Sequence, residues 1–289
     1  MYRFTIITTL VCSLIMSISC SEKKSSADSG LDNTLATNEP KLADGLIRIG
    51  LPEKLDYLIK NLVLSDNMIM TLSTNNNIFN YELLNKYENV GLYTTSRSKA
   101  INLGIYGADL NYLIHFGQSE NSIRYLIASR QLAGQIGVAM AFDQETMDEY
   151  QSNLENKDAL INIIFLAYEN VKKMLKSEDQ FLLSTLVITG SWIENMYLTT
   201  KLLPYFESSE VKTKLVDKLL QQREYLTNMR ELISELHEGD NIFVNDLLEQ
   251  LNKIDAVYET FQGKLLTEED IKTLEFQVAE LRSKVIQID

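Results

Sequence analysis

The sequence predicts an all-α protein, either a multi-helix antiparallel bundle or an array of helical hairpins, with no sheet. Three observations support this fold class. Apolar residues recur at alternating spacings of three and four from Met147 to Val285, which places them on one face of a helix. The 289 residues include three prolines, with none between Pro52 and Pro204, so long helices are not interrupted. No segment shows the alternation of polar and apolar residues that a strand requires over more than a few positions.

The first segment, residues 1–19, has the organisation of an export signal. Arg3 gives a positive start, an uncharged run follows from Phe4 to Met16, and small residues precede Cys20. This order is typical of a secretory signal peptide that is removed before Cys20. It resembles the signal of bacterial lipoproteins, and the resemblance implies acylation of the Cys20 thiol and a membrane-anchored protein outside the cytoplasm.

Two alternatives to acylation remain at this stage. Ser17 occupies the position where the lipoprotein pattern usually has leucine. Ser17 and Ser19 also suit the ordinary signal peptidase, which would leave Cys20 as a free N-terminal thiol. The uncharged stretch is shorter than the ~20 residues that cross a bilayer, which argues against an uncleaved transmembrane helix. The only other cysteine, Cys12, lies within the signal, so the exported chain has no pair for an intramolecular disulfide.

Residues 20–48 predict a flexible tether that begins at the acylated cysteine. Residues 21–44 are rich in polar residues and contain no aromatic residue, so they bury too little apolar surface to offset the entropy of ordering the chain. Such a tether would hold the folded body away from a lipid surface. By resemblance to enteric lipoproteins, Ser21 in place of aspartate points to the outer membrane, at its periplasmic face or at the cell surface.

Residues 49–205 predict a helical core region that is rich in glycine. Six glycines lie in or beside its apolar helical patterns: Gly104, Gly107, Gly117, Gly134, Gly137 and Gly190. A glycine inside a helix costs about 1 kcal/mol relative to alanine. Close approach of two helix backbones would offset this cost. The functional alternative is a ligand cleft that these small residues line.

Helix boundaries in the second half of this region follow from capping residues. Asp143 is predicted to cap a segment that extends to Leu175, either as one long helix or as two helices joined near residues 156–158. A capping box of Ser177 and Gln180 predicts the start of the next helix. Pro204 ends that helix.

Residues 206–289 predict antiparallel helical hairpins. One helix has an apolar seam from Leu215 to Leu236, and the Glu-Gly-Asp-Asn sequence at 238–241 predicts the turn after it. A second helix carries apolar residues from 247 to 261. A third begins at Thr267, with Asp270 in the capping-box position. His237, at the end of the first helix, is expected to interact with the helix dipole.

Charge and composition exclude several partners and cofactors. The formal net charge is −13, and −14 once Arg3 is removed, so phosphate backbones and anionic head groups would repel the chain. We therefore expect no nucleic acid partner, and membrane attachment only through the anchor. The two histidines, His115 and His237, do not form the motifs of di-iron bundles or zinc proteases, and no phosphate-binding glycine motif occurs. No metal and no cofactor are expected.

The most unusual polar constellation consists of six side chains on two segments: Tyr106, Asp109, Tyr112, His115, Trp192 and Glu194. The first three are spaced by three and share one stripe of a helix, and His115 lies at its edge. Asp109 and Glu194 lie in otherwise apolar runs, so we expect each to be buried with a partner. Arg124 and Arg130 are the nearest basic residues.

Two functional interpretations compete with a buried polar cluster. In the first, Trp192 and the tyrosines stack on an apolar or sugar-like ligand that the two carboxylates hold. In the second, Asp109 and Glu194 act as the carboxylate pair of a glycoside hydrolase.

Residues 103–198 contain Tyr-Gly-Ala-Asp-Leu-Asn-Tyr at 106–112 and Gly-Ser-Trp-Ile-Glu-Asn-Met-Tyr at 190–197. This stretch, about a third of the chain, resembles a group of uncharacterised all-helical lipoproteins of Gram-negative bacteria. The resemblance implies a location and no activity.

The sequence therefore predicts a membrane-anchored lipoprotein of the cell envelope that acts as a non-enzymatic binding or scaffolding module, with envelope proteins as partners. The alternatives are a small-ligand receptor with its pocket between the glycine-rich helices, and an envelope hydrolase that uses Asp109 and Glu194.

Overall fold

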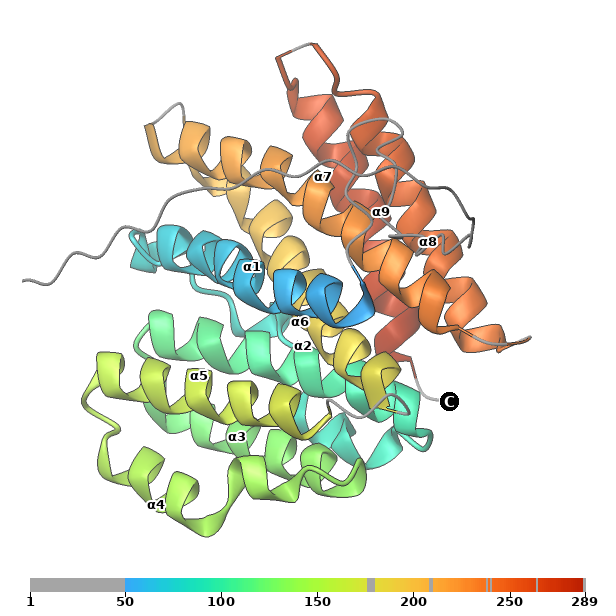
Figure 1. Ribbon diagram of the computed structural model, residues 1–289. Helices are drawn as coiled ribbons and strands as arrows, with labels where there is room; N and C mark the ends of the chain where they lie inside the picture. The colour runs from blue at the N-terminus through green and yellow to red at the C-terminus, as the bar shows by residue number, and fades with distance from the viewer. Residues whose placement is uncertain are drawn as a thin grey trace, which may run out of the picture. The chain divides into compact units, whose positions relative to one another are not determined.

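The computed structural model describes residues 50–175, 180–207, 210–237, 239, 241–263 and 265–287. The expected signal (1–19), Cys20 and the tether (20–48) lie outside the described residues. Helices and connecting loops make up the described part of the chain, which contains no strand, so the predicted fold class is confirmed (Figure 1). By their contacts, the described residues belong to one compact unit.

Two buried helices form the centre of this unit. They are α2 (Ser96–His115) and α6 (Phe181–Leu202), and they pack on each other more extensively than any other two described helices. Most side chains of both helices are buried, on every side of the helix axis. A helix that is covered all round needs no polar face, which explains why neither sequence shows one clearly.

Two glycines set the distance between α2 and α6. A Cβ atom on Gly104 would lie 1.9 Å from the carbonyl oxygen of Val187, and one on Gly190 would lie 1.8 Å from the carbonyl oxygen of Ile101. The backbone of each helix therefore contacts a glycine of the other helix, at a position that has no room for a side chain. The close approach predicted from the glycine positions is confirmed for this pair.

The remaining helices of the first part pack around this centre. Helix α1 (Leu51–Leu72) packs on α6 and on the later helix α7, whereas α3 (Ser119–Gln135) and α5 (Lys157–Met174) pack on α2. The short helices η4 (Ala139–Phe142) and α4 (Gln144–Ser152) connect α3 to α5. Helices α3, α4 and α5 thus lie together beside α2.

The segment from 143 to 175 forms two helices, which decides between the two predicted alternatives. Asp143 accepts a hydrogen bond of 2.9 Å from the amide of Thr146 and caps α4, as predicted. Asn156 accepts one of 3.1 Å from the amide of Ala159 and starts α5. The predicted capping box at Ser177 lies outside the described residues, and α6 is described from Phe181.

Between α1 and α2, residues 76–92 form three short 3₁₀-helices, which we call the 76–92 segment. They are η1 (Asn76–Ile78), η2 (Tyr81–Leu83) and η3 (Tyr87–Leu92). The segment contacts α2 and α3. No motif in the sequence predicts it.

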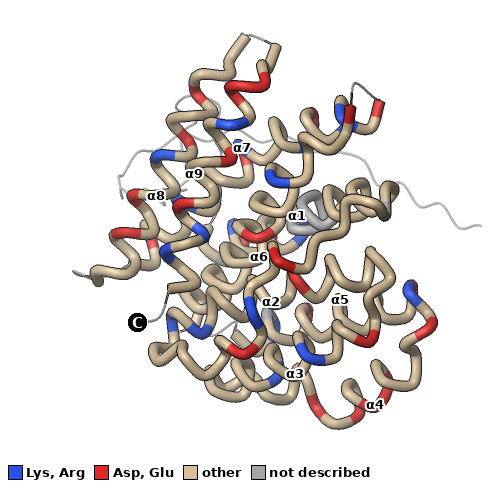
Figure 2. Tube along the Cα trace, turned by 180° about the vertical axis from the view of Figure 1, so that it is seen from behind, with Lys and Arg blue, Asp and Glu red and all other residues tan. Residues whose placement is uncertain are grey.

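The last part of the chain forms the predicted helical hairpins. Helix η6 (Leu203–Tyr205) ends the region before it, and α7 (Glu210–Leu236), α8 (Ile242–Glu259) and α9 (Glu268–Ile286) then pack in sequence. Helices α7 and α9 also pack on α6. Figure 2 shows charged residues spread along all three helices. The apolar residues of their seams are buried.

The capping box of α9 and the turn between α7 and α8 lie where the sequence predicts them. Asp270 and Thr267 form the capping box of α9, with hydrogen bonds of 2.9 and 3.2 Å. Gly239 lies in the α7–α8 turn with a φ of 84°, a left-handed conformation that favours glycine. His237 lies one residue beyond α7, where its ring nitrogen Nε2 is 3.0 Å from the side-chain oxygen of Asn245.

We expect alanine at Gly104 or Gly190 to lower the free energy of unfolding by about 3 kcal/mol or more, because the new Cβ must push two backbones apart. Gly134 on α3 is the matched control, since a Cβ there meets nothing within 4 Å. Gly134→Ala should raise stability by up to about 1 kcal/mol through helix propensity. Urea denaturation followed by circular dichroism measures these changes. Equal effects at Gly104 and Gly134 would contradict the packing argument.

Candidate functional site

The predicted stripe on α2 is confirmed, because Tyr106, Asp109 and Tyr112 all face the 76–92 segment. Asp109 accepts a hydrogen bond of 3.2 Å from the amide of Asn85, and the Tyr112 hydroxyl accepts one of 3.0 Å from the amide of Asn80. All three side chains of the stripe are fully buried. They therefore satisfy backbone groups of an irregular segment that has no regular hydrogen-bond ladder.

Glu194 on α6 forms a two-point ion pair with Arg282 of α9. The Nε atom of Arg282 lies 2.6 Å from one carboxylate oxygen, and a terminal nitrogen lies 2.8 Å from the other. The same terminal nitrogen donates to the carbonyl oxygen of Leu83 at 2.8 Å. The guanidinium also lies over the ring of Tyr197, 4.1 Å from its centroid. Glu194 is 0% exposed.

Neither of the nearest basic residues in the sequence pairs with Asp109 or Glu194. Arg124 on α3 donates to the hydroxyl of Tyr87 at 3.0 Å, and Arg130 donates to the side chain of Gln144 at 3.2 Å. Arg282 lies 88 residues after Glu194 in the chain. Sequence proximity could not identify it, because α9 reaches α6 only through the packing of the hairpins.

Asp109 and Glu194 lie next to each other in the interior. Burial, and next the charge of Glu194, raise the pKa of Asp109 well above its usual range, and Arg282 only partly opposes them. The Oδ1 atom of Asp109 accepts no hydrogen bond within the described part of the chain. A protonated Asp109 donates instead, and Glu194 is the acceptor beside it. One carboxyl group is therefore neutral, and Arg282 balances the other.

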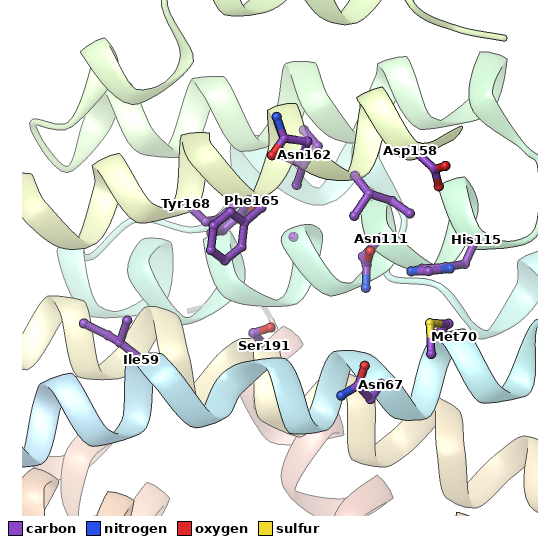
Figure 3. Close-up of a pocket in the computed structure, with 13 residues that line it drawn as sticks. Ile59, Asn67, Met70, Asn111, His115, Asp158, Asn162, Phe165, Tyr168 and Ser191 are labelled. Carbon is purple, nitrogen blue, oxygen red and sulfur yellow. The ribbon is translucent and has the colours of Figure 1, made fainter. Parts of the chain in front are cut away.

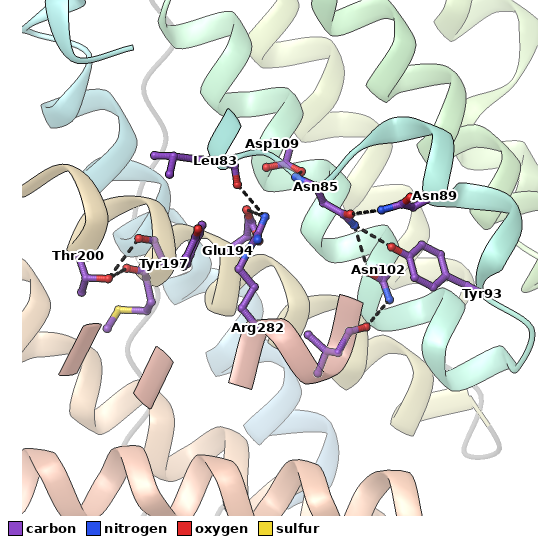
Figure 4. Close-up of polar contacts among 12 residues, drawn as sticks. Leu83, Asn85, Asn89, Tyr93, Asn102, Asp109, Glu194, Tyr197, Thr200 and Arg282 are labelled. Carbon is purple, nitrogen blue, oxygen red and sulfur yellow. Dashed lines mark hydrogen bonds and ion pairs between the residues drawn. The ribbon is translucent and has the colours of Figure 1, made fainter. Parts of the chain in front are cut away.

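Asparagine side chains extend this network between α2 and α9 (Figure 4). Asn102 on α2 donates to the carbonyl oxygen of Val285 on α9 at 2.8 Å. Asn85 donates to the hydroxyl of Tyr93 at 2.8 Å and lies 3.4 Å from the side-chain oxygen of Asn102. The network thus links the 76–92 segment, α2, α6 and α9.

Trp192 does not belong to this network. Its indole nitrogen donates to the side chain of Gln222 on α7 at 3.1 Å, and the ring is 0% exposed. Apart from His115, the residues of the predicted constellation therefore belong to a filled core, and their buried rings offer no surface on which a ligand could stack. Asp109 and Glu194 are fully buried, and Arg282 holds Glu194, so the carboxylate pair is closed to a glycoside substrate.

A separate cleft lies on another side of α2, between α1 and α5 (Figure 3). We call it the α1–α2–α5 cleft. Its volume is about 350 Å³, within the range of small-molecule sites. Ile59 and Met70 of α1, with Ile161 and Phe165 of α5, give it apolar walls.

Small residues form the floor of the cleft. Gly107 of α2 and Ser191 of α6 line it. A Cβ on Gly107 would lie 2.3 Å from the hydroxyl oxygen of Tyr168. That hydroxyl donates to the carbonyl oxygen of Leu103 at 2.8 Å. Gly107 therefore lets the ring of Tyr168 reach α2 and form one wall of the cleft.

His115, the fourth residue of the predicted constellation, lies in this cleft and not in the buried network. It is 9% exposed, and its Nδ1 atom has no hydrogen-bond partner in the described structure. Burial lowers the pKa of His115 to about 4, the charge of Lys157 adds to this, and Asp158 opposes it. Lys157 also donates to the carbonyl oxygen of His115 at 2.9 Å. The imidazole is therefore neutral at pH 7.

The described residues contain no group of three or more His, Cys, Asp or Glu side chains that could hold a metal ion. No described helix is both long and apolar enough to cross a membrane. A comparison with family models, curated proteins and solved structures found no significant match to this chain. The site is thus interpreted from its own residues.

Sequence reasoning missed most of the cleft. Asn67, Asn111 and Asp158 line it, and none of them was a candidate. One signal was available, because Gly107, Asn111 and His115 are spaced by four and share a face of α2. The spacing alone does not show that α1 and α5 leave this face partly open.

Replacing Asp109 by asparagine should raise the free energy of unfolding at pH 7. In the wild-type protein, the unfolded chain loses the Asp109 proton above about pH 4 while the folded chain keeps it, so this group lowers stability as the pH rises. Asparagine does not ionise, and it donates to Glu194 in the same way. The difference in the free energy of unfolding between the variant and the wild-type protein should increase from pH 4 upward by up to about 1.4 kcal/mol per pH unit.

Denaturation with guanidinium at several pH values measures this gain. Asp217→Asn, at an exposed position of α7, is the matched control for the loss of one carboxyl group. A destabilised Asp109→Asn variant, or a gain that is the same at pH 4 and pH 7, would show that Asp109 is ionised in the folded protein.

Proposed function

We propose that this protein is a lipid-anchored binding protein of the bacterial cell envelope that holds a small ligand in the α1–α2–α5 cleft. The observation that carries the proposal is the cleft itself, which has a volume of about 350 Å³ and apolar walls. Asn67, Asn111 and Asp158 place a few polar groups among these walls. A concave, mainly apolar cavity with a small number of polar groups is the usual form of a small-molecule site.

The arrangement of the cleft favours binding over catalysis. Ser191 is the lining residue with a hydroxyl that resembles a nucleophile, and its amide lies close to Gly104 in the packed helix pair. His115 is eleven residues after Gly104 on α2, which is a separation of about 16 Å at the rise of an α-helix. A base at that separation does not reach the serine. The hydrolase alternative also loses its other support, because Asp109 and Glu194 are closed to substrate.

The anchor is the second part of the proposal and is supported by the order of residues 1–20. Acylation of Cys20 would place the cleft on the outer side of the cytoplasmic membrane, and the polar residues 21–44 would give it reach. Ser21 supports an outer-membrane position. Two or more acyl chains hold a protein firmly, whereas one chain holds it only weakly.

Apolar side chains beside the cleft support a scaffolding role as the second candidate. Phe165 and Leu166 of α5 are 47% and 51% exposed, and Met70 of α1 is 51% exposed. Exposed apolar side chains that lie close together mark protein contact sites. An envelope protein recovered with the wild-type chain, and lost with Leu166→Glu, would favour this role over ligand binding.

Asn111→Phe should abolish ligand binding, because the larger side chain fills the floor of the cleft. Gln131→Phe on the exposed face of α3 is the matched control. Thermal-shift screening of small molecules from envelope extracts should find a ligand that stabilises the wild-type and Gln131→Phe proteins but not the Asn111→Phe protein. A ligand at 100 times its Kd adds about 2.7 kcal/mol. Equal stabilisation of all three proteins would place the ligand elsewhere.

Cys20→Ser should move the protein from the membrane fraction to the soluble fraction, because it removes the thiol that carries the acyl groups. Mass spectrometry of the wild-type protein should find Cys20 as an acylated N-terminus. Growth with a labelled fatty acid checks the same point, with the label absent from the variant. A soluble intracellular protein that retains residues 1–19 would overturn the anchor.

A further inference from the structure

The α1–α2–α5 cleft runs lengthwise between its three helices. Along α1, its lining residues extend from Ile59 to Met70, a separation of about 16 Å at the rise of an α-helix. Helix α5 carries its lining residues in the opposite order, from Asp158 at the Met70 end to Tyr168 towards Ile59 (Figure 3). The cleft is therefore an elongated groove, which a narrow, extended molecule fits better than a compact one.

Uncharged polar side chains occupy the middle of this groove. They come from four helices and are Asn67, Asn111, Asn162 and Ser191. None of the four side chains forms a hydrogen bond within the described part of the chain. Unlike Nδ1 of His115, their polar atoms are not closed off by the protein. They can therefore exchange a hydrogen bond with water for one with a ligand.

The two ends of the groove differ from its middle. Ile59, Phe165 and Tyr168 form one end, which is apolar and aromatic. At the other end, Met70 lies beside His115, and Asp158 projects from α5. Phe165 is 47% exposed and Met70 is 51% exposed, so a ligand would remove apolar surface from water at both ends.

The groove disfavours a ligand with negative charge. Among the described residues that line it, none is Lys or Arg, and Asp158 is the charged one. Lys157, the neighbouring cation in the sequence, donates to the carbonyl oxygen of His115. A carboxylate or phosphate in the groove would lie near Asp158 without a cation to neutralise it, which costs free energy in a partly desolvated site.

A peptide group suits the middle of the groove better than a hydrocarbon chain or a sugar does. A hydrocarbon chain would cover the asparagines and leave their carboxamides without partners. A sugar carries hydroxyl groups on most of its carbons, and those at the aromatic end would lose water without gaining a partner. A peptide group has one donor and one acceptor, and a carboxamide offers both in return.

We propose that the ligand is a short, uncharged peptide whose peptide group pairs with the carboxamides of Asn111 and Asn162 and whose apolar side chain lies against Phe165 and Tyr168. This inference rests on the proposed function, since it names the class of ligand that the cleft binds. An extended peptide advances about 3.3 Å per residue, so the groove has the length of roughly four residues. An aromatic side chain at the apolar end would add ring contacts to the area that is buried.

Four probes test the proposal. The first is N-acetyl-leucyl-phenylalanine amide, which is uncharged. The second is its ester analogue, in which an oxygen atom replaces the NH group between the two residues, and the third is N-acetyl-leucyl-phenylalanine with a free carboxylate. The fourth is N-acetylglucosamine, a sugar that also carries an amide.

Each probe is titrated into the Cys20→Ser chain, in which no acyl group competes for the cleft, and binding is measured by isothermal calorimetry. We expect the first probe to bind roughly tenfold more tightly than each of the others. Relative to it, the ester lacks one hydrogen-bond donor, the acid carries an unpaired charge, and the sugar lacks the apolar side chains.

Asparagine variants show which carboxamides hold the peptide group. Asn111→Leu and Asn162→Leu together remove both carboxamides and keep side chains of similar size, so the preference for the amide over the ester should fall from roughly tenfold to below roughly twofold. Asn170→Leu, at an exposed position of α5 away from the cleft, is the matched control and should keep the full preference. If the double variant does not fold, Asn162→Leu alone, at an exposed position of α5, should still lower the preference.

The outcomes distinguish a failure of this inference from a failure of the proposed function. Equal binding of the first probe and any of the other three, or an unchanged preference in the asparagine variants, would overturn the peptide assignment and leave the binding role of the cleft intact. The same holds if no probe binds while an envelope ligand stabilises the wild-type protein but not Asn111→Phe. Probe binding that persists in Asn111→Phe would place the site outside the cleft and overturn both, as would the absence of any ligand.

Discussion

The close packing of α2 on α6 is the constraint on which the rest of the structure depends. Gly104 and Gly190 let each backbone touch the other helix, and an added Cβ at either position would lie within 2 Å of a carbonyl oxygen. Both helices are then covered on their remaining sides by α1, α3, α5, α7 and α9. The loss of helix propensity at the two glycines is offset by the burial that this contact allows.

The faces of α2 have separate roles although most of its residues are buried, because one face contacts the 76–92 segment and another lines the α1–α2–α5 cleft. Tyr106, Asp109 and Tyr112 point to the 76–92 segment, where a closed polar network joins them to Glu194 and Arg282. Positions 107, 111 and 115 point between α1 and α5, where the cleft lies. A shift of one residue is a rotation of 100° about the helix axis, so the two sets cannot share a site. The network fixes α2, and this fixed helix positions His115 in the cleft.

The sequence predicts those features that depend on spacing within one segment. It predicts the caps at Asp143 and Thr267, the stripe of tyrosines on α2 and the close approach at two glycines, because each has a local physical signature. It does not identify Arg282 as the partner of Glu194, since that contact depends on how three hairpin helices pack on α6. The cleft escapes prediction for a similar reason. Its existence depends on the separation of α1 and α5, which no periodicity encodes, although the spacing of Gly107, Asn111 and His115 marks its floor.

Native-state hydrogen exchange tests the central role of the α2–α6 contact most directly, because it measures the opening free energy of each amide. If the pair is the centre of the fold, amides of residues 100–113 and 186–199 exchange only when the whole unit unfolds, with one common free energy. Amides near the ends of α8 and α9 then exchange by smaller openings. Exchange of α2 or α6 amides at a lower free energy than those of α8 would contradict the account.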